Sequence, residues 1–470
     1  MSQGLCFLPA TELAQRIRAK DLSARELMCA TLAQIERVNP RLNAIVTLHA
    51  EQALAEAQAA DEKQSRGEAL GPLHGLPVAH KDLLLTRGMR TTYGSPIFKD
   101  FVPGQSMLMI ERLQAAGAIS IGKTNTPEFG AGSQTFNTVF GKTLNPYDLS
   151  KTCGGSSGGA AVALAAGMVP LADGTDMGGS LRCPANFCNV VGLRTSPGRV
   201  PIWPAKTGWS GLSVQGPMGR TVADCALMLS VTAGWDAKSP IAIAQPGSVF
   251  ARPLARDFKG VRIAWSADLG GLPVDARVSA VIASQRGAFA SLGCAIDEAA
   301  PDFSDAHDIF QTLRAWQFEF NYGDLLDKHR DLLKDTVIWN IEAGRKLTGP
   351  QIGAAELKRT GLYNRMRGFM ERFEFLILPV NQVPPFDVNQ PYVSEINGVK
   401  MDSYIDWMKS CYYITVTGHP AISVPCGFTP GGLPVGVQIV GRHQDDFGVL
   451  QLAHAFEQAT QIGKRRPELE

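Results

Sequence analysis

The spacing of apolar positions changes near Leu76, from the period of amphipathic helices to short apolar runs that alternate with helices. Before that point, residues 24–38 and 51–64 carry apolar side chains at intervals of three and four, which predicts two helices. Each has a polar face opposite its apolar one. Both helices are therefore expected to pack onto the core from outside.

The first of these helices has a recognisable start and end. Ser23 and Glu26 have the spacing of a capping box, in which each side chain binds the backbone amide of the other residue. Asn39 and Pro40 follow the last apolar position, and proline disfavours a continuing helix. The helix is predicted to begin after Ser23 and to stop at Asn39–Pro40.

Beyond Leu76, short β runs and helices take turns along the chain, which is the pattern of a sheet covered by helices. The expected fold class is α/β, with a large mixed, mostly parallel twisted sheet covered by helices on both faces. A hairpin turning at Gly431–Gly432 is expected near its end. The predicted strands are 77–85, 118–121, 168–173, 190–193, 261–265, 294–296, 375–380 and 421–428, and the predicted helices are 106–116, 157–166 and 276–292.

The section between roughly residues 300 and 375 is helical and rich in charged and aromatic side chains, which is typical of the wall or lid of a pocket. Because β segments lie on both sides of it, one large sheet with an insertion is favoured over separable domains. Residues 1–470 are expected to form one domain, with N-terminal helices (1–70), a catalytic core (71–235), a more variable βαβ and helical pocket-wall section (236–375) and a return to the core sheet (376–470).

Charge and composition exclude several classes of partner. Lysine plus arginine (45) nearly balance aspartate plus glutamate (44), so the chain lacks the basic surplus of a nucleic-acid-binding protein, and a small uncharged substrate is expected. The longest apolar run, 160–172, is too short to span a bilayer and contains Gly167 and Pro170. With no secretion signal at the start, a cytoplasmic protein without membrane contact is expected. Nine scattered cysteines without a C-x-x-C pair predict buried reduced thiols rather than a metal site.

Two glycine-flanked serines, 24 residues apart, are the strongest candidates for chemistry. Ser180 follows Met177, Gly178 and Gly179, whose backbone N–H groups could surround a developing oxyanion, so Ser180 is expected to be a nucleophile. Ser156 lies in a GGSSGG run at the start of a predicted helix, where the alternative is a simple helix N-cap.

Lys81 is the expected base. It lies in an otherwise apolar strand, and the alternation of side chains places it on the opposite face from His80 and Asp82. A lysine buried without a carboxylate partner has a lowered pKa and offers a neutral amine near neutral pH. The alternative is a lysine at a strand end whose ammonium reaches water.

Two other loop hypotheses are weaker. A phosphate-binding P-loop requires G-K-[ST] at the start of the helix, and Gly158-Gly159-Ala160 contains no lysine. The G-x-S-x-G pattern around Ser156 is compatible with a nucleophile elbow using His419, His443 or His454. An elbow must follow a hydrophobic strand, however, and residues 145–153 have the composition of a loop.

Three motifs, GLPVAHKDLL around Lys81, GGSSGG at 154–159 and GTDMGGSLR at 174–182, occur in the order found in the amidase signature family, which the chain resembles. That family includes fatty-acid amide hydrolase, malonamidase, aryl and aliphatic amidases and the A subunit of glutamyl-tRNA amidotransferase. The resemblance covers most of the chain, is weakest over 236–375, and continues through KTNTPEFGAGSQT (123–135), FGKTLNPYD (140–148), GPMGRTVAD (216–224) and HPAISVPCGF (419–428).

The resemblance implies the amidase signature fold and a Ser–cisSer–Lys triad. Ser180 would attack the amide carbonyl, Ser156, after a cis bond from Gly155, would relay its proton, and neutral Lys81 would be the base. Water would then hydrolyse the acyl-enzyme, without a metal or organic cofactor. The positions that match the family's oxyanion hole and acyl site are Met177, Gly178, Gly179 and Gly130.

Substrate preference is the least constrained inference. Arg182 matches a family arginine expected to form a buried salt bridge, and Cys183 stands where the malonate-specific member binds a carboxylate, so a charged acyl group is not expected. Many aromatic residues suggest a pocket for an aryl or bulky apolar group. The candidates for its walls are Trp203, Trp209, Trp316, Phe320, Trp339, Tyr404 and Trp407.

The sequence thus predicts a serine amidohydrolase that acts on small neutral amides, aryl amides among them, with water as the second reactant. Three alternatives remain open: the glutamine-hydrolysing component of a tRNA-dependent amidotransferase, a family member acting mainly on carbamates or esters, and a non-catalytic binding scaffold. Oligomeric state is also open, with a homodimer as one option.

Overall fold

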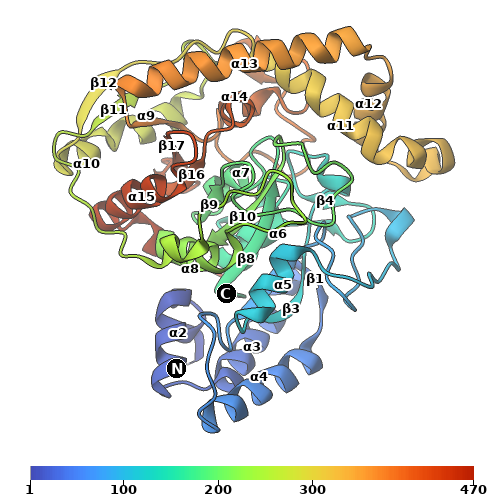
Figure 1. The fold of residues 1–470 in the computed structure, drawn as a ribbon, viewed down its shortest axis with the longest axis vertical. Helices are drawn as coiled ribbons and strands as arrows, with labels where there is room; N and C mark the ends of the chain where they lie inside the picture. Colours follow the sequence, from blue (N-terminus) through green and yellow to red (C-terminus); the bar gives the residue numbers. More distant parts are fainter. Residues whose placement is uncertain (1, 470) are drawn as a thin grey trace.

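One sheet extends through the molecule and joins segments from both ends of the chain (Figure 1). The computed structural model describes residues 2–469. The sheet has 11 strands in the spatial order β1-β3-β2-β8-β10-β9-β16-β17-β13-β11-β12. Their bounds, in that order, are Ile45–Leu48, Ile119–Thr124, Pro77–Lys81, Leu171–Asp176, Val214–Gly219, Val191–Arg194, Ala421–Phe428, Pro434–Gly441, Phe375–Pro379, Arg262–Trp265 and Ala295–Glu298.

The predicted α/β class and mixed sheet are confirmed, but the sheet is not mostly parallel. Six of its ten neighbouring strand pairs are antiparallel and four are parallel. The sequence pattern did not predict β1 or β10, and these two strands take part in three of the antiparallel pairs. The predicted hairpin is present as β16–β17 and supplies another antiparallel pair.

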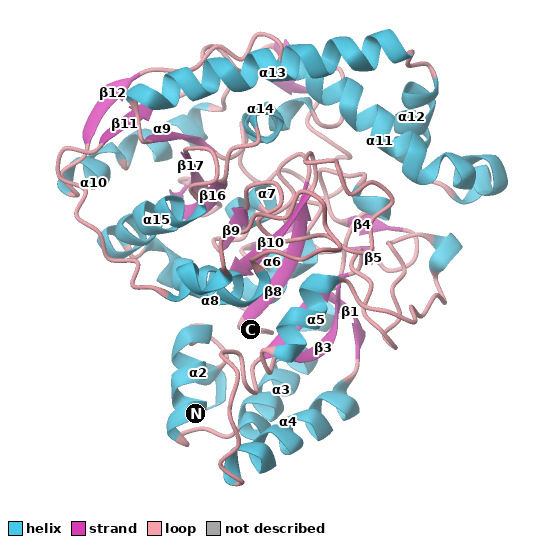
Figure 2. Ribbon diagram, in the orientation of Figure 1, coloured by secondary structure: helices cyan, strands magenta, loops and turns pink. Residues whose placement is uncertain are grey.

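Helices cover both faces of the sheet, as predicted (Figure 2). Side-chain alternation along the strands divides the interior into two cores: in β13, Leu376 and Leu378 face one core, whereas Phe375 and Ile377 face the other. The first core is covered by α3 (Ala24–Leu42), α4 (Ala50–Ser65), α6 (Gly158–Ala165), α7 (Arg182–Phe187), α11 (Ala306–His329), α13 (Gly349–Arg372) and α14 (Lys409–Thr417). The second is covered by α2 (Ala10–Ala19), α5 (Leu108–Ala115), α8 (Val222–Thr232), α9 (Ala276–Ser284), α10 (Arg286–Ser291) and α15 (Asp446–Thr460).

Helix α3 begins as predicted but ends later. Ser23 Oγ accepts a hydrogen bond from the Glu26 amide at 3.0 Å, and the Ser23 amide donates to Glu26 Oε2 at 2.9 Å, which confirms the capping box. The expectation that Asn39–Pro40 stops the helix is wrong, because the helix runs to Leu42. Pro40 lies in the last turn, where its missing amide removes a single hydrogen bond, and the Asn39 carbonyl still accepts from the Asn43 amide at 2.7 Å.

The helical section between 300 and 375 stands beside the sheet as a group of long helices, coloured yellow to orange in Figure 1. It consists of α11, α12 (Asp335–Arg345) and α13, and α11 packs against both of the others. Helix α11 also forms one wall of the cavity that Ser156 and Ser180 line. The single helix predicted at 276–292 is divided into α9 and α10.

Two further expectations concern the whole chain. All nine cysteines are unpaired and eight of them are buried, with Cys29 as the exposed exception. Among the described residues, no helix combines the length and apolar character needed to cross a membrane.

The capping box of α3 gives a first testable prediction. Replacement of Ser23 by alanine is expected to lower the free energy of unfolding by about 1 kcal/mol, because the Glu26 amide loses its acceptor. Urea denaturation followed by circular dichroism measures this loss. Ser65→Ala is the matched control, since the Ser65 hydroxyl only donates to the Glu62 carbonyl within α4. Equal losses in the two variants would contradict the role of the cap.

Candidate active site

Ser156 and Ser180 line the same cavity, which has a volume of about 360 Å³. The cavity opens beside the ends of β2 and β8, and its walls include Gly130, Met177 and Gly178, three of the residues that the sequence analysis associated with the site. Gly130 has a φ of +72°, and a Cβ there would lie 3.4 Å from Ser156 Oγ. The two glycine loops are therefore brought together as predicted.

Lys81 lies at the end of β2 and is fully buried. Its Nζ lies within hydrogen-bonding distance of three hydroxyl groups, Ser156 Oγ at 2.7 Å, Ser157 Oγ at 2.9 Å and Thr175 Oγ1 at 3.0 Å. Burial lowers the pKa of Lys81 to about 7, although the carboxylates of Asp176 and Asp173 oppose the shift. The alternative of an ammonium reaching water is wrong.

The two neighbours of Lys81 point to the other face of β2, as the alternation predicted. His80 Nδ1 lies 2.5 Å from Asp173 Oδ2, and the Asp82 carboxylate accepts from the amide and hydroxyl of Thr92. Asp173 Oδ1 also accepts the backbone amide of Lys81 at 2.8 Å. Both carboxylates are thus occupied elsewhere, and neither forms an ion pair with the Lys81 amine.

The extended run expected over 77–85 is shorter in the structure. Strand β2 ends at Lys81, where the Leu84 amide donates to the Lys81 carbonyl at 2.9 Å and the chain turns. This turn carries Leu83, Leu84 and Leu85 into the cavity wall. Lys81 consequently sits at the border between the sheet and the cavity.

Ser156 follows a cis peptide bond from Gly155, at the position that the family resemblance implied. The N-cap alternative for Ser156 is wrong, because Ser157 occupies the N-cap position of α6 and caps no amide with its side chain. The Ser157 amide donates to the Ser180 carbonyl at 3.2 Å and ties the two loops together. A Cβ at Gly159 would lie 2.3 Å from the Asn125 amide nitrogen, so the start of α6 requires glycine there.

The loop before Ser180 differs in one respect from the expected oxyanion hole. Met177 and Gly178 line the cavity, but the Gly179 amide donates to Asp176 Oδ1 at 3.0 Å. Gly179 also has a φ of +113°, and a Cβ there would lie 2.6 Å from the Cβ of Cys411. Gly179 therefore serves the close contact between the loop and α14, and its amide is not free to receive an oxyanion in this structure.

No hydrogen bond joins the hydroxyls of Ser156 and Ser180 within the described chain. Hydrogen bonds between catalytic groups are often long in enzymes without substrate and shorten in the substrate complex. The two hydroxyls line the same cavity, so the arrangement is compatible with such a contact once substrate binds.

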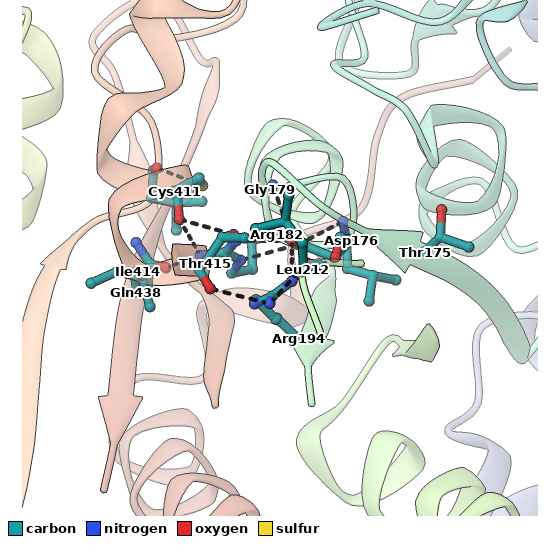
Figure 3. A network of polar contacts seen from close by, with 12 residues as sticks. Thr175, Asp176, Gly179, Arg182, Arg194, Leu212, Cys411, Ile414, Thr415 and Gln438 are labelled. Carbon is teal, nitrogen blue, oxygen red and sulfur yellow. Dashed lines mark hydrogen bonds and ion pairs between the residues drawn. The ribbon is translucent and has the colours of Figure 1, made fainter. Parts of the chain in front are cut away.

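A buried carboxylate network supports this loop from behind (Figure 3). Asp176, at the end of β8, is fully buried and pairs with Arg182 at 2.9 Å and Arg194 at 3.2 Å. Burial alone would raise the pKa of Asp176, but the two guanidinium groups outweigh it and hold that pKa well below its usual range. The predicted buried salt bridge of Arg182 is confirmed.

Arg182 also connects the loop to the C-terminal part of the sheet. Its Nη1 donates to the Cys411 carbonyl at 2.9 Å and to Gln438 Oε1 at 2.6 Å, and its Nη2 donates to Thr415 Oγ1 at 2.9 Å. These three partners follow Arg182 by 229 to 256 residues. The position of Ser180 thus depends on contacts made far away in the sequence.

The aromatic candidates were mostly wrong. Of the seven residues proposed for the cavity wall, only Tyr404 lines it. Trp209 is 80% exposed on the surface, and Trp407 is fully buried with its indole Nε1 donating to Ser133. Tryptophan content did not indicate the pocket because smaller aromatic rings form it. The aromatic residues that do line the cavity are Tyr93, Phe129, Phe310, Phe318, Tyr322, Tyr404 and Tyr412.

Sequence reasoning also missed the hydroxyl partners of Lys81. Thr175 and Ser157 each contact its amine, and both lie in the motifs quoted for the serines. The strand predicted at 168–173 is β8, which lies three residues further on and carries Thr175 beside β2. The available signal in the sequence was the hydroxyl of Thr175, which lies near the end of an otherwise buried strand.

The histidine-based alternative receives no support from the geometry. His419, His443 and His454 do not line the cavity, and burial lowers the pKa of His419 to about 4. Residues 148–152, expected to be loop, form a short strand, β7, which lies outside the main sheet and pairs with β6 (Leu144–Asn145) and, through a bridge at Lys151, with Asp387. Cys183 is fully buried, lies 3.2 Å from Asn381 Nδ2 and is not part of the cavity wall.

Comparisons with known proteins agree with one another. The family model described as Amidase matches residues 26–450. An acylamidase from Rhodococcus erythropolis is 37% identical over 99% of this chain and 98% of its own length. The A subunit of the glutamyl-tRNA(Gln) amidotransferase of Moorella thermoacetica is 35% identical over 99% of both chains.

Among solved structures, a bacterial aryl acylamidase of the amidase signature enzymes superposes with a TM-score of 0.91. It is 30% identical in sequence, and the match covers 98% of this chain and 99% of the other. The likeness therefore extends beyond the glycine loops to the whole sheet and the helices around it.

The carboxylate network gives the second prediction. Asp176→Asn is expected to lower the free energy of unfolding by about 3–5 kcal/mol, because two buried guanidinium groups lose their counter-charge. Thermal and urea unfolding measure the loss. Asp327→Asn is the control, since that carboxylate forms an exposed ion pair with Arg345, and a much smaller change is expected. Similar losses for both variants would refute the structural role assigned to Asp176.

Proposed function

From the premise that the chain belongs to the amidase signature family and is a hydrolase of amide C–N bonds, we propose that it cleaves small acyl amides, including aryl amides, through an acyl-enzyme on Ser180. The observation that carries the proposal is the 2.7 Å contact between the buried Lys81 amine and Ser156, at the edge of the cavity that also holds Ser180. A neutral amine in this position is a suitable general base.

The proposed first step is a proton transfer in two stages. Lys81 takes the proton of the Ser156 hydroxyl while Ser156 takes the proton of Ser180, and Ser180 Oγ forms a bond to the amide carbonyl carbon. The ammonium of Lys81 then remains solvated by the hydroxyls of Ser157 and Thr175, which accept its other protons. Charge moves into a site that already contains polar partners for it.

Backbone amides stabilise the tetrahedral intermediate in this proposal. The candidates are the amides of Met177, Gly178 and Ser180, because the Gly179 amide is bound to Asp176. Preorganised donors of this kind cost little reorganisation during the reaction, and loss of one reduces kcat by about 10² to 10³. The Asp176 network holds these amides in place by fixing the loop from behind.

Collapse of the intermediate breaks the C–N bond. The leaving nitrogen receives the proton from Ser156, which is resupplied by the Lys81 ammonium, and the acyl group stays on Ser180. A water molecule then attacks the acyl carbon while its proton passes to Ser156 and Lys81. The bond between Ser180 Oγ and the acyl carbon breaks, Ser180 regains a proton from the same relay, and the carboxylic acid leaves. These steps use only side chains, backbone amides and water.

The aromatic walls and the two acylamidase relatives support an acyl amide with an aryl or other bulky apolar part. A second candidate is the glutamine-hydrolysing component of an amidotransferase, since the Moorella thermoacetica relative belongs to such an enzyme and has nearly equal identity. Hydrolysis of acetanilide by the purified chain alone would support the amidase, whereas glutaminase activity that requires a second protein would support the alternative.

The nucleophile assignment predicts the effect of two serine variants. Ser180→Ala is expected to form no covalent adduct with a fluorophosphonate or sulfonyl fluoride, and to lose amidase activity by at least about 10³-fold, because no oxygen is left to acylate. Ser156→Ala is expected to react slowly with the same reagents, since Ser180 remains but its proton relay is lost. Intact-protein mass spectrometry detects the adduct.

His443→Asn is the matched control for these variants, because this histidine lies outside the cavity. It should retain wild-type turnover and full labelling. An adduct on Ser180→Ala, or loss of activity in the histidine variant, would contradict the assignment.

The base assignment predicts the pH dependence. With a Lys81 pKa near 7 in the free enzyme, kcat/KM should rise about tenfold per pH unit below that pKa and level off above it, since only the neutral amine accepts a proton. Initial rates on a neutral anilide from about pH 5.5 to 10 measure the profile. Chemistry must be rate-limiting, which a lack of dependence on solvent viscosity establishes. A flat profile through this range would exclude Lys81 as the base.

A further inference from the structure

The wall of the cavity that Ser156 and Ser180 line carries charge of one sign. Lys206 and Arg314 line it, and no aspartate or glutamate of the described residues does. A cleft lined by one sign of charge raises the local concentration of ligands with the opposite sign. The cavity is therefore electropositive, in contrast to the near-neutral chain from which an uncharged substrate was expected.

Arg314 differs from the other buried arginines in its partners. Its side chain donates from Nη1 to Asn340 Oδ1 and from Nη2 to the hydroxyl of Tyr404, both uncharged, and among the described residues it forms no ion pair. The residue is 5% exposed. A buried charge without a counter-charge is unfavourable. The presence of such a charge in the wall of a cavity therefore points to an anionic ligand that supplies the counter-charge. The other buried arginines, Arg182, Arg194 and Arg199, each lie within 3.2 Å of an aspartate carboxylate.

The guanidinium of Arg314 is also held rigidly. Its Cζ lies 4.7 Å from the ring centroid of Phe318, one turn further along α11, and 5.3 Å from that of Tyr404. Asn340 Nδ2 in turn donates to the Tyr404 hydroxyl at 3.0 Å, which closes a ring of contacts between α11, α12 and the segment before α14. The two hydrogen bonds to Asn340 and Tyr404 use two of the five N–H groups of a guanidinium. Arg314 lines the cavity, and its remaining donors form no hydrogen bond with any described residue.

We propose that Arg314 is a specificity-determining residue that binds a carboxylate at the end of the substrate remote from the scissile amide. This inference rests on the proposed function, because the amide is the one cleaved at Ser180. A carboxylate suits the site because it accepts two parallel hydrogen bonds from a guanidinium and supplies the missing counter-charge. In this role Arg314 makes noncovalent contacts only and takes no part in bond formation or cleavage.

Two matched substrate pairs test the proposal. The first is 4-acetamidobenzoate against 4-acetamidobenzamide, with the carboxylate on the amine side, and the second is the mono-anilide of succinic acid against the anilide of succinamide, with it on the acyl side. In at least one pair, wild-type kcat/KM should be about 10- to 100-fold higher for the acid, as expected for a charge-assisted hydrogen bond. Arg314→Met should abolish this ratio, mainly through KM, and Arg314→Lys should keep part of it.

The ratio within one variant does not depend on the fraction of protein that is folded, so partial unfolding of the Met variant leaves it measurable. Arg367→Met is the matched control, because this arginine is exposed on α13 and pairs only with Glu371, and it should keep the wild-type ratio. A wild-type ratio of one or less in both pairs would overturn the proposal, as would an unchanged ratio in Arg314→Met. If that variant is insoluble, an unchanged ratio in Arg314→Lys overturns it.

A binding measurement separates this proposal from the proposed function. In isothermal titration calorimetry, Ser180→Ala should bind the acid of the preferred pair about 10- to 100-fold more tightly than the matching amide. This preference should be present whether or not the wild type hydrolyses either compound. Equal affinities would overturn the assignment of Arg314. Failure of the wild type to hydrolyse any of the four amides, with tighter binding of the acid preserved, would instead count against the proposed function.

Discussion

The burial of the Lys81 amine among hydroxyl groups is the interaction on which the chemistry of the cavity depends. Lys81 is fully buried at the end of β2, and the three contacts of its amine are to uncharged oxygens. Desolvation then favours the neutral form. The nearby Asp173 carboxylate would restore the charge if it turned toward the amine, but His80 and the Lys81 backbone amide hold it on the other side of the strand.

The buried cations of the protein fall into three groups that differ in their partners and in whether they keep their charge. Lys81 can give up its proton, whereas Arg182 and Arg194 keep their charge and share the carboxylate of Asp176. Arg314 keeps its charge with neutral partners only. Lys81 serves as the proposed base, and the two arginines paired with Asp176 stabilise the loop that carries Ser180. Arg314 provides a positive charge that can attract an anionic ligand to the cavity wall. Burial is common to all three, so the type of cation, amine or guanidinium, and the charge of its partner together decide the role.

Local features were predictable from the sequence, and features that depend on distant partners were not. The capping box of Ser23 and Glu26 follows from spacing within a few residues. Strand β10 was missed because β8 and β9 satisfy its edges, and its own Gly- and Pro-containing sequence does not mark it as a strand. At the site, the motifs located both serines but could not show that Asp176 occupies the Gly179 amide, which depends on how the loop folds back. An arginine on a helix is usually a surface residue, so only the packed structure shows Arg314 buried.

The contacts of Arg182 join early and late parts of the chain, so the site can be completed only late in synthesis. Lys81 and both serines leave the ribosome early, whereas Gln438, which completes the support of their loop, follows Arg182 by 256 residues. At roughly 5–20 residues per second, translation of that interval takes on the order of ten seconds or more. During that time the chain carries the reactive groups of the site without the contact from Arg182 to Gln438. Hydrolytic competence would thus come only with β17, which is the last strand of the chain.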